Sequence, residues 1–166
     1  SPEDEPCNYP DEYPPFTHIL TRSMAVMETE LTRRMWWDLQ ALQPDLPDDP
    51  TMEIYGAGAN NPVQRNTWYE SVLFANLLSL SNGYTRSYYA DAEFTIPIDV
   101  MNYTTGPFFC DFEADGYRLP TEGEWEYFTR AGTRGPFACE EPNYTDDTCG
   151  DPYCVSGEFP VFEQYA

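Results

Sequence analysis

The sequence predicts an irregular, loop-rich α+β domain with about three short helices and a few short strands. Three stretches carry helix-start signals or helical apolar spacing, and none of them is long. Sixteen prolines and ten glycines lie largely between these stretches and indicate many turns. The chain of 166 residues is 41% hydrophobic and 16% aromatic, which suits one folded domain. We expect residues 1–15 to form an acidic, proline-rich arm and residues 16–166 to form the domain.

The first part of the domain should hold a strand pair followed by a helix. Residues 18–20 and 24–27 are short apolar runs separated by a polar step, a pattern typical of two paired strands. Thr32 then has the side chain of a helix N-cap. The helix predicted near residues 33–43 should bury one apolar face, made of Met35, Trp36, Leu39 and Leu42.

The second helix is marked at both ends. Thr67 and Glu70 have the spacing of a capping box, in which each side chain accepts a hydrogen bond from the other residue's backbone N–H. Apolar residues continue to Leu80 and cover most of the helix surface, so we expect this helix to be largely buried. Asn82-Gly83 supplies the left-handed residue that ends it. Residues 84–110 should form one or two irregular strands.

A second capping box, Thr121 and Glu124, predicts the third helix. Glu122 lies in its first turn, where the helix dipole favours an anion. We expect Trp125 to be buried, and the helix to end at Ala131-Gly132.

The charge of the chain is strongly negative. Asp and Glu number 29 against eight bases, all of them arginine, for a net charge of −21. Such a field repels nucleic acid and anionic lipid, so neither is expected as a partner. No run approaches the roughly 18 apolar residues that cross a bilayer, so membrane insertion is not expected either. The polar start of the chain resembles the trimmed edge of a mature protein.

Five cysteines favour disulfide bonds and an oxidising compartment. The chain has one histidine, and the cysteine spacings do not fit paired zinc knuckles. We therefore expect a secreted, periplasmic or cell-surface protein. An odd number leaves at least one thiol that is free or bonded outside the chain, and the connectivity stays open. The disulfide candidates are Cys7, Cys110, Cys139, Cys149 and Cys154.

An acidic loop near the end of the chain is a candidate calcium site. Calcium prefers carboxylate and carbonyl oxygens. The loop lacks the spacing of an EF-hand, and a solvated acidic surface is the alternative interpretation. The candidate ligands are Asp146, Asp147 and Asp151.

A long motif resembles the formylglycine-generating enzyme, or sulfatase-modifying factor, family. That family carries Tyr-Arg-Leu-Pro-Thr-Glu-Ala-Glu-Trp-Glu-Tyr, and this chain differs within that stretch only at Gly123. Shorter matches precede it in the same order, at residues 27–32 and 61–79. The motif here reads Gly116-Tyr117-Arg118-Leu119-Pro120-Thr121-Glu122-Gly123-Glu124-Trp125-Glu126-Tyr127.

The resemblance implies a C-type-lectin-like fold. It also implies a copper(I) site of two cysteines in oxidases of the family, since soft thiolates suit that ion. Those cysteines lie beyond the matched region, and Cys149 and Cys154 sit among aspartates that disfavour a thiolate. By the family's layout the domain is incomplete at its C-terminus. Copper is thus expected only if a separate C-terminal chain of the same domain supplies the cysteines.

For the motif itself we predict a structural role: a turn, a capping box and a buried tryptophan. Arg118 should pair with Glu122, Glu126 or backbone carbonyls. The same structural interpretation is preferred for His18 over a catalytic base. The motif residues are Arg118, Thr121, Glu122, Glu124 and Trp125.

Two functions compete. The first is a non-catalytic binding or interaction module with a protein or glycan ligand. The second is the N-terminal portion of a copper-dependent oxidase that converts a substrate cysteine to formylglycine. In that case exposed aromatics would line the substrate groove, with Trp36, Trp37 and Tyr88 as candidates.

Overall fold

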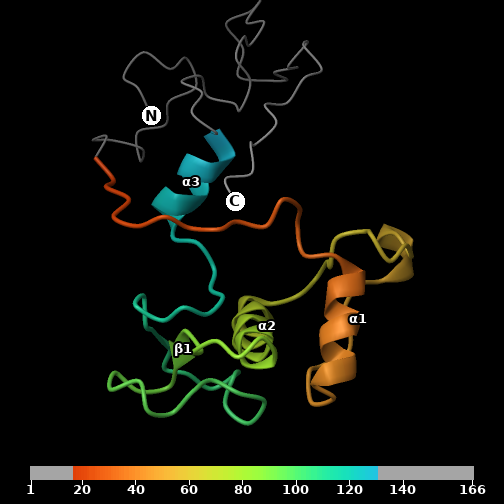
Figure 1. Cartoon of the computed structure of the whole chain (residues 1–166). Coiled ribbons are helices and arrows are strands. Elements are labelled where there is room, and N and C mark those ends of the chain that lie inside the picture. The colour runs from red at the N-terminus through yellow and green to blue at the C-terminus, as the bar shows by residue number, and fades with distance from the viewer. Residues whose placement is uncertain (1–16, 131–166) are drawn as a thin grey trace, which may run out of the picture. The chain divides into compact units, whose positions relative to one another are not determined.

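A computed structural model describes residues 17–130 of the chain (Figure 1). These residues fall into two compact units, one of Met27–Leu119 and one that includes residues 17–26 and 120–130. The elements in chain order are α1 (Arg33–Leu42), the 3₁₀ helix η2 (Glu53–Tyr55), α2 (Trp68–Ser81), β1 (Tyr88–Tyr89), β2 (Phe109–Cys110) and α3 (Glu122–Arg130). The predicted class, an irregular α+β fold with three short helices and short strands, is confirmed.

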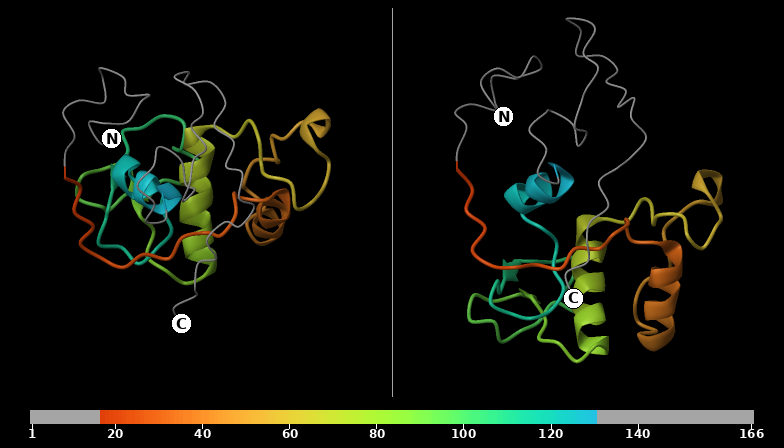
Figure 2. Two further views of the ribbon diagram at one scale, coloured as in Figure 1. Left: turned by 90° about the horizontal axis from the view of Figure 1, so that it is seen from above. Right: turned by 45° about the horizontal axis from the view of Figure 1, so that its top comes forward.

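Helix α2 is the centre of the larger unit, and apolar side chains pack on two of its sides. On one side the indole of Trp36 from α1 stacks on Phe74, with the ring centroids 5.2 Å apart. On the other side Val72 packs with Tyr88 and Ile98. Figure 2 shows α1 beside α2, and the loops that carry β1 on the other side of α2. The prediction that α2 is largely buried is therefore confirmed.

Both ends of α2 form as the sequence predicts. At the start, the backbone N–H of Thr67 donates to the Glu70 carboxylate over 2.6 Å, and the N–H of Glu70 donates to the Thr67 hydroxyl over 3.2 Å. At the end, Gly83 adopts a φ of 77°. The N–H groups of Gly83 and Tyr84 then donate to the carbonyls of Leu80 and Ser79, the pair of bonds of a Schellman motif.

The buried amide of Asn76 joins α2 to the strand region. Its Nδ2 donates to the carbonyl oxygens of Tyr88 and Ile98, both over 2.8 Å. Its Oδ1 accepts from the N–H of Tyr88 over 3.0 Å. One side chain thus satisfies backbone groups that a larger sheet would otherwise pair.

The sheet itself is very small. Strands β1 and β2 pair antiparallel, with Tyr88 opposite Cys110 and Tyr89 opposite Phe109. An isolated bridge joins Tyr89 to Pro97. These strands confirm the expectation of one or two irregular strands in residues 84–110.

Helix α1 forms as predicted but buries less than its sequence indicates. Thr32 caps it, accepting from the N–H of Met35 over 3.3 Å. Trp36 and Leu39 are buried, whereas Met35 is 43% exposed and Leu42 is 69% exposed. The expected face of four buried residues is therefore only half correct, because α2 covers one side of the stripe and leaves the other open.

The strand pair predicted in residues 18–20 and 24–27 is wrong. Neither run is a strand, and Ile19, Val26 and Met27 are exposed. Short apolar runs become strands only where a partner accepts their backbone hydrogen bonds. Pairing in this region occurs instead slightly later, where the N–H of Val63 donates to the Leu31 carbonyl over 2.8 Å.

The second capping box also forms. The N–H of Thr121 donates to the Glu124 carboxylate over 2.8 Å, and the N–H of Glu124 donates to the Thr121 hydroxyl over 3.4 Å. The expected burial of Trp125 is wrong, since it is 60% exposed. Glu124 takes the buried position on α3, and the next residue points about 100° away around the helix.

His18 lies against the position where this chain departs from the family motif. A Cβ added at Gly123 would lie 2.7 Å from the Cγ and Nδ1 atoms of His18. Glycine at residue 123 therefore leaves room for the imidazole, and this contact agrees with a structural role for His18.

Across residues 17–130, the structure contains no helix both long enough and apolar enough to span a membrane.

Candidate functional site

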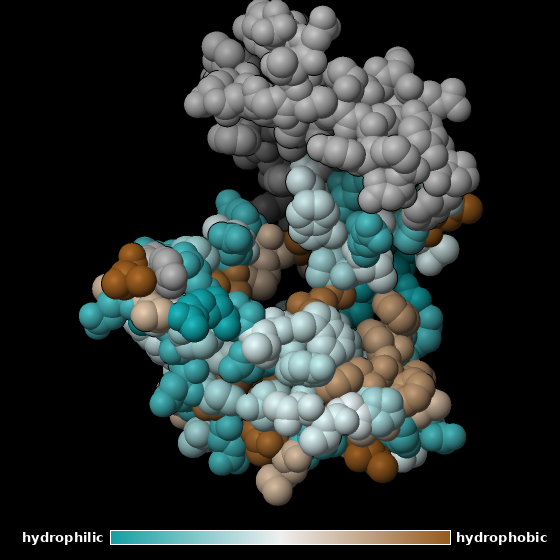
Figure 3. All heavy atoms as spheres, turned by 180° about the vertical axis from the view of Figure 1, so that it is seen from behind, coloured by the Kyte–Doolittle hydropathy of each residue, from teal (hydrophilic) through white to brown (hydrophobic). Residues whose placement is uncertain are grey.

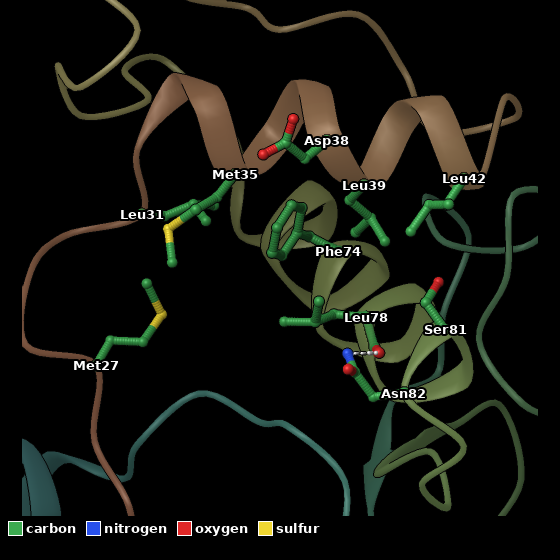
Figure 4. Close-up of a pocket in the computed structure, with 10 residues that line it drawn as sticks. All are labelled: Met27, Leu31, Met35, Asp38, Leu39, Leu42, Phe74, Leu78, Ser81 and Asn82. Carbon is green, nitrogen blue, oxygen red and sulfur yellow. Dashed lines mark hydrogen bonds between the residues drawn. The ribbon is translucent and has the colours of Figure 1, made fainter.

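A groove lies between α1 and α2 in the larger unit. Its volume is about 290 Å³. Figure 4 shows Met35, Leu39 and Leu42 from α1 on one wall, and Phe74 and Leu78 from α2 on the other. We call this the α1–α2 groove; its remaining lining residues are Met27, Leu31, Asp38, Ser81 and Asn82.

The groove has an apolar floor and an adaptable rim. Within the two walls, Leu39 and Phe74 are buried at the bottom of the groove, while Met35 and Leu42 stay exposed at the rim. In Figure 4, Met27 points toward Met35 from the segment that precedes α1. Methionine side chains are flexible and polarizable, so such a rim adapts to partners of different shape.

The opposite side of α1 is fixed by an ion pair. Arg33 Nε lies 2.6 Å from Asp49 Oδ2, and the Arg33 guanidinium also donates to the Gly56 carbonyl over 2.9 Å. Burial acts to raise the pKa of Asp49, but hydrogen bonds from Arg33 and Thr51, together with the charge of Arg33, outweigh it and hold the pKa below its ordinary value. These contacts fasten α1 to the loop that follows it and so hold one wall of the α1–α2 groove.

The aromatic residues expected at a substrate groove do not gather there. Trp36 and Tyr88 are buried in the core, which corrects the expectation that they are exposed. Trp37 is 37% exposed, but its Nε1 donates to Asp49 over 3.0 Å and its ring lies under the Arg33 guanidinium. All three residues therefore have structural contacts that explain them.

A second exposed surface is aromatic. Trp68 and Tyr69 begin α2, and both rings contact Phe108, with centroids 4.9 Å and 5.4 Å away. Figure 3 shows apolar residues reaching the surface at several separate places on the face it draws. Sequence reasoning missed both this surface and the α1–α2 groove. The available signal was the excess of apolar residues on α1 and α2 over what one core face can bury.

Of the structural features predicted for the family motif, the capping box forms, whereas Trp125 is exposed. Arg118 donates to the Leu119 carbonyl over 3.1 Å, and its guanidinium lies 5.0 Å from the centre of the Phe112 ring. The predicted bond from Arg118 to a backbone carbonyl is thus present. Thr121, Glu122, Glu124 and Trp125 are at the start of α3, and two of them make its capping box.

The candidate metal and disulfide residues are mostly beyond the described part of the chain. Cys110 is half-buried in β2. The other disulfide and calcium candidates lie outside the described residues: Cys7, Cys139, Cys149, Cys154, Asp146, Asp147 and Asp151. Within residues 17–130, no three His, Cys, Asp or Glu side chains gather as metal ligands. A copper site of two thiolates does not fit this part, because it contains a single cysteine.

These features define a loop-rich α+β domain with capped helices and a small sheet that a buried amide joins to α2. Residues 10–155 match the family described as the sulfatase-modifying factor enzyme 1-like domain. This chain belongs to that family, and its fold is the irregular, C-type-lectin-like fold that the family motif implies.

Similar proteins include one curated relative and two solved structures. Chaperone protein LppX of Paenibacillus barcinonensis is 31% identical over 137 residues, which make up 80% of this chain and 45% of that protein. The crystal structure of CarF is 25% identical, with a TM-score of 0.51, over 64% of this chain and 44% of CarF. Treponema denticola variable protein 1 is 25% identical, with a TM-score of 0.48, over 65% of this chain and 42% of that one. The chain thus spans less than half the length of the relatives it matches.

Proposed function

We propose that this chain is a secreted, non-catalytic binding module that holds an apolar segment of another polypeptide in the α1–α2 groove. The single observation that carries the proposal is the groove itself, an apolar depression of about 290 Å³ whose rim residues Met35 and Leu42 are not part of the core. The name of the relative from Paenibacillus barcinonensis, a chaperone protein, supports a role in binding polypeptides.

The energetic case rests on the exposed rim. Leu42 is 69% exposed and Met35 is 43% exposed, so a partner can remove most of the first and part of the second from water. Full burial of one such side chain contributes about 1.5–3 kcal/mol, and a tenfold change in Kd corresponds to about 1.4 kcal/mol. Loss of Leu42 alone should therefore weaken binding about tenfold.

The test is a binding titration with a fluorescent peptide of about 18 residues that forms a neutral amphipathic helix. The full chain should bind the peptide, and the Leu42→Glu variant should bind it about tenfold more weakly or not at all. Met101→Glu is the matched control, because Met101 is 86% exposed and does not line the groove. Equal loss in both variants, or no binding by the parent chain, would contradict the proposal.

The second candidate is the N-terminal portion of a copper-dependent formylglycine-generating oxidase, and membership of the family is the observation that favours it. In that case a C-terminal chain of the same domain supplies both copper-binding cysteines, and calcium at Asp146, Asp147 and Asp151 is a separate proposal. Intact mass with and without reductant tests for such a partner chain. Copper-dependent oxygen uptake with a cysteine peptide would then favour the oxidase over the binding module.

A further inference from the structure

The walls of the α1–α2 groove form two helical ridges. On α1, Met35, Leu39 and Leu42 are spaced four and three residues apart, so they lie along one face of the helix. On α2, Phe74 and Leu78 form the facing ridge. From Met35 to Leu42 the groove runs about 10 Å, which equals two turns of a partner helix. A third helix could set its own ridge of side chains between these two.

The backbone around the groove favours a helical partner over an extended one. Both long walls are helices, whose backbone N–H and C=O groups are used within each helix. An extended peptide would find no strand edge there to pair with, whereas a helix satisfies its own backbone. The two polar side chains at one end of the groove already have hydrogen-bond partners within the chain. The Ser81 hydroxyl accepts from Gln43 over 3.1 Å, and the Asn82 amide donates to the Leu78 carbonyl over 2.9 Å.

The charges around the groove are mostly negative. Asp38 is the one charged residue that lines it, and within the described part of the chain Asp38 has no ion-pair partner. Glu28 and Glu30 are exposed in the segment between Met27 and Leu31, which closes one end. Residues 27–42 contain two bases. Arg33 is paired with Asp49, which leaves Arg34, one turn before Asp38 on α1, as the other positive charge. The partner should therefore carry positive charge beside its apolar stripe.

The net charge of the whole chain also favours a positively charged partner. With a net charge of −21 and no lysine, a second copy would be repelled, and so would an acidic partner. Resting on the proposed function, we propose that the α1–α2 groove binds an amphipathic helix of another protein whose apolar stripe is flanked by lysine or arginine. Apolar burial supplies the affinity, and the acidic rim selects the charge of the partner.

The experiment compares four peptides with the full chain by fluorescence anisotropy. Three share one apolar stripe and carry lysine, glutamine or glutamate at the flanking positions; the fourth is a scrambled form of the lysine peptide without a stripe. The lysine peptide should bind about tenfold more tightly than the glutamine peptide, and the glutamate peptide more weakly than both. The lysine advantage should disappear at about 1 M salt, where the screening length is near 3 Å.

Two variants assign the charge preference to the rim. Asp38→Asn should weaken the lysine peptide about threefold and leave the glutamine peptide unchanged. Glu93→Gln removes the same charge from an exposed loop that does not line the groove, so it should change neither. An equal effect of both variants would assign the preference to the net charge of the chain and overturn the role of the rim.

The peptide results separate the two proposals. If the glutamine peptide binds through Leu42 and the lysine peptide binds no more tightly, the charge inference is overturned while the binding function stands. If the scrambled lysine peptide binds as tightly as the striped one, the attraction is electrostatic and the helix inference is overturned. If no peptide binds, both proposals fail.

Discussion

Replacing Asn76 with alanine should destabilise the domain by about 3 kcal/mol. The side chain is fully buried and makes three hydrogen bonds to the backbone of Tyr88 and Ile98. The Tyr88 carbonyl would keep one partner, because it also accepts from the N–H of Ile98 over 2.9 Å. The Tyr88 N–H and the Ile98 carbonyl would lose the bond from this amide, and each buried unsatisfied group costs about 1–3 kcal/mol.

Urea unfolding followed by tryptophan fluorescence measures the effect as a lower midpoint at unchanged slope. Asn76→Asp should cost at least as much, since an ionised carboxylate has no N–H to donate to the two carbonyls. Asn82→Ala is the control: that amide is exposed, has one bond to Leu78, and should matter by less than about 0.5 kcal/mol. If Asn76→Ala were as mild as this control, the amide would not be what holds the strand region to α2.

Two further predictions concern the loops around α1 and β1. Because the pKa of Asp49 is lowered in the folded state, its pairing with Arg33 stabilises the fold above the ordinary pKa of 3.8, and this contribution is lost as the pH falls through the folded value. The stability difference between the parent and Asp49→Asn, followed by urea unfolding, should therefore be constant above about pH 5 and shrink below it; a constant difference down to pH 2 would refute this. Gly116→Ala should destabilise by about 2–3 kcal/mol in the same assay, because the new Cβ would collide with the Thr85 carbonyl oxygen, and a neutral effect would show that the loop can shift.

Helix ends were predictable because their signals are local. A threonine and a glutamate three residues apart need only each other's backbone to form a capping box, so the starts of α2 and α3 follow from sequence. The left-handed Gly83 ends α2 for an equally local reason. The family motif was informative about the fold for the same reason, since it includes the capping-box residues Thr121 and Glu124.

The strands and the burial of single aromatics were not predictable in this way. A strand depends on a partner far along the chain, and residues 18–20 and 24–27 have the composition of strands without such a partner. Exposure of Trp125 depends on which side of α3 meets other residues, and Glu124 occupies that side. The role of Asn76 was equally hidden, because nothing in its neighbours along the sequence indicates that its amide meets Tyr88 and Ile98.

The α1–α2 groove exists because the apolar stripe of α1 is a local pattern, whereas the part of it that is buried depends on how α2 packs against it. Apolar periodicity gives α1 one stripe, but the core takes only Trp36 and Leu39 from it, because α2 approaches from one side. Met35 and Leu42 remain as apolar surface that the described fold does not need. Exposed apolar side chains of this kind are the surface that the proposed partner would cover. The proposed binding therefore rests on Met35 and Leu42, the half of the α1 stripe that the core leaves exposed, whereas Trp36 and Leu39 belong to the fold.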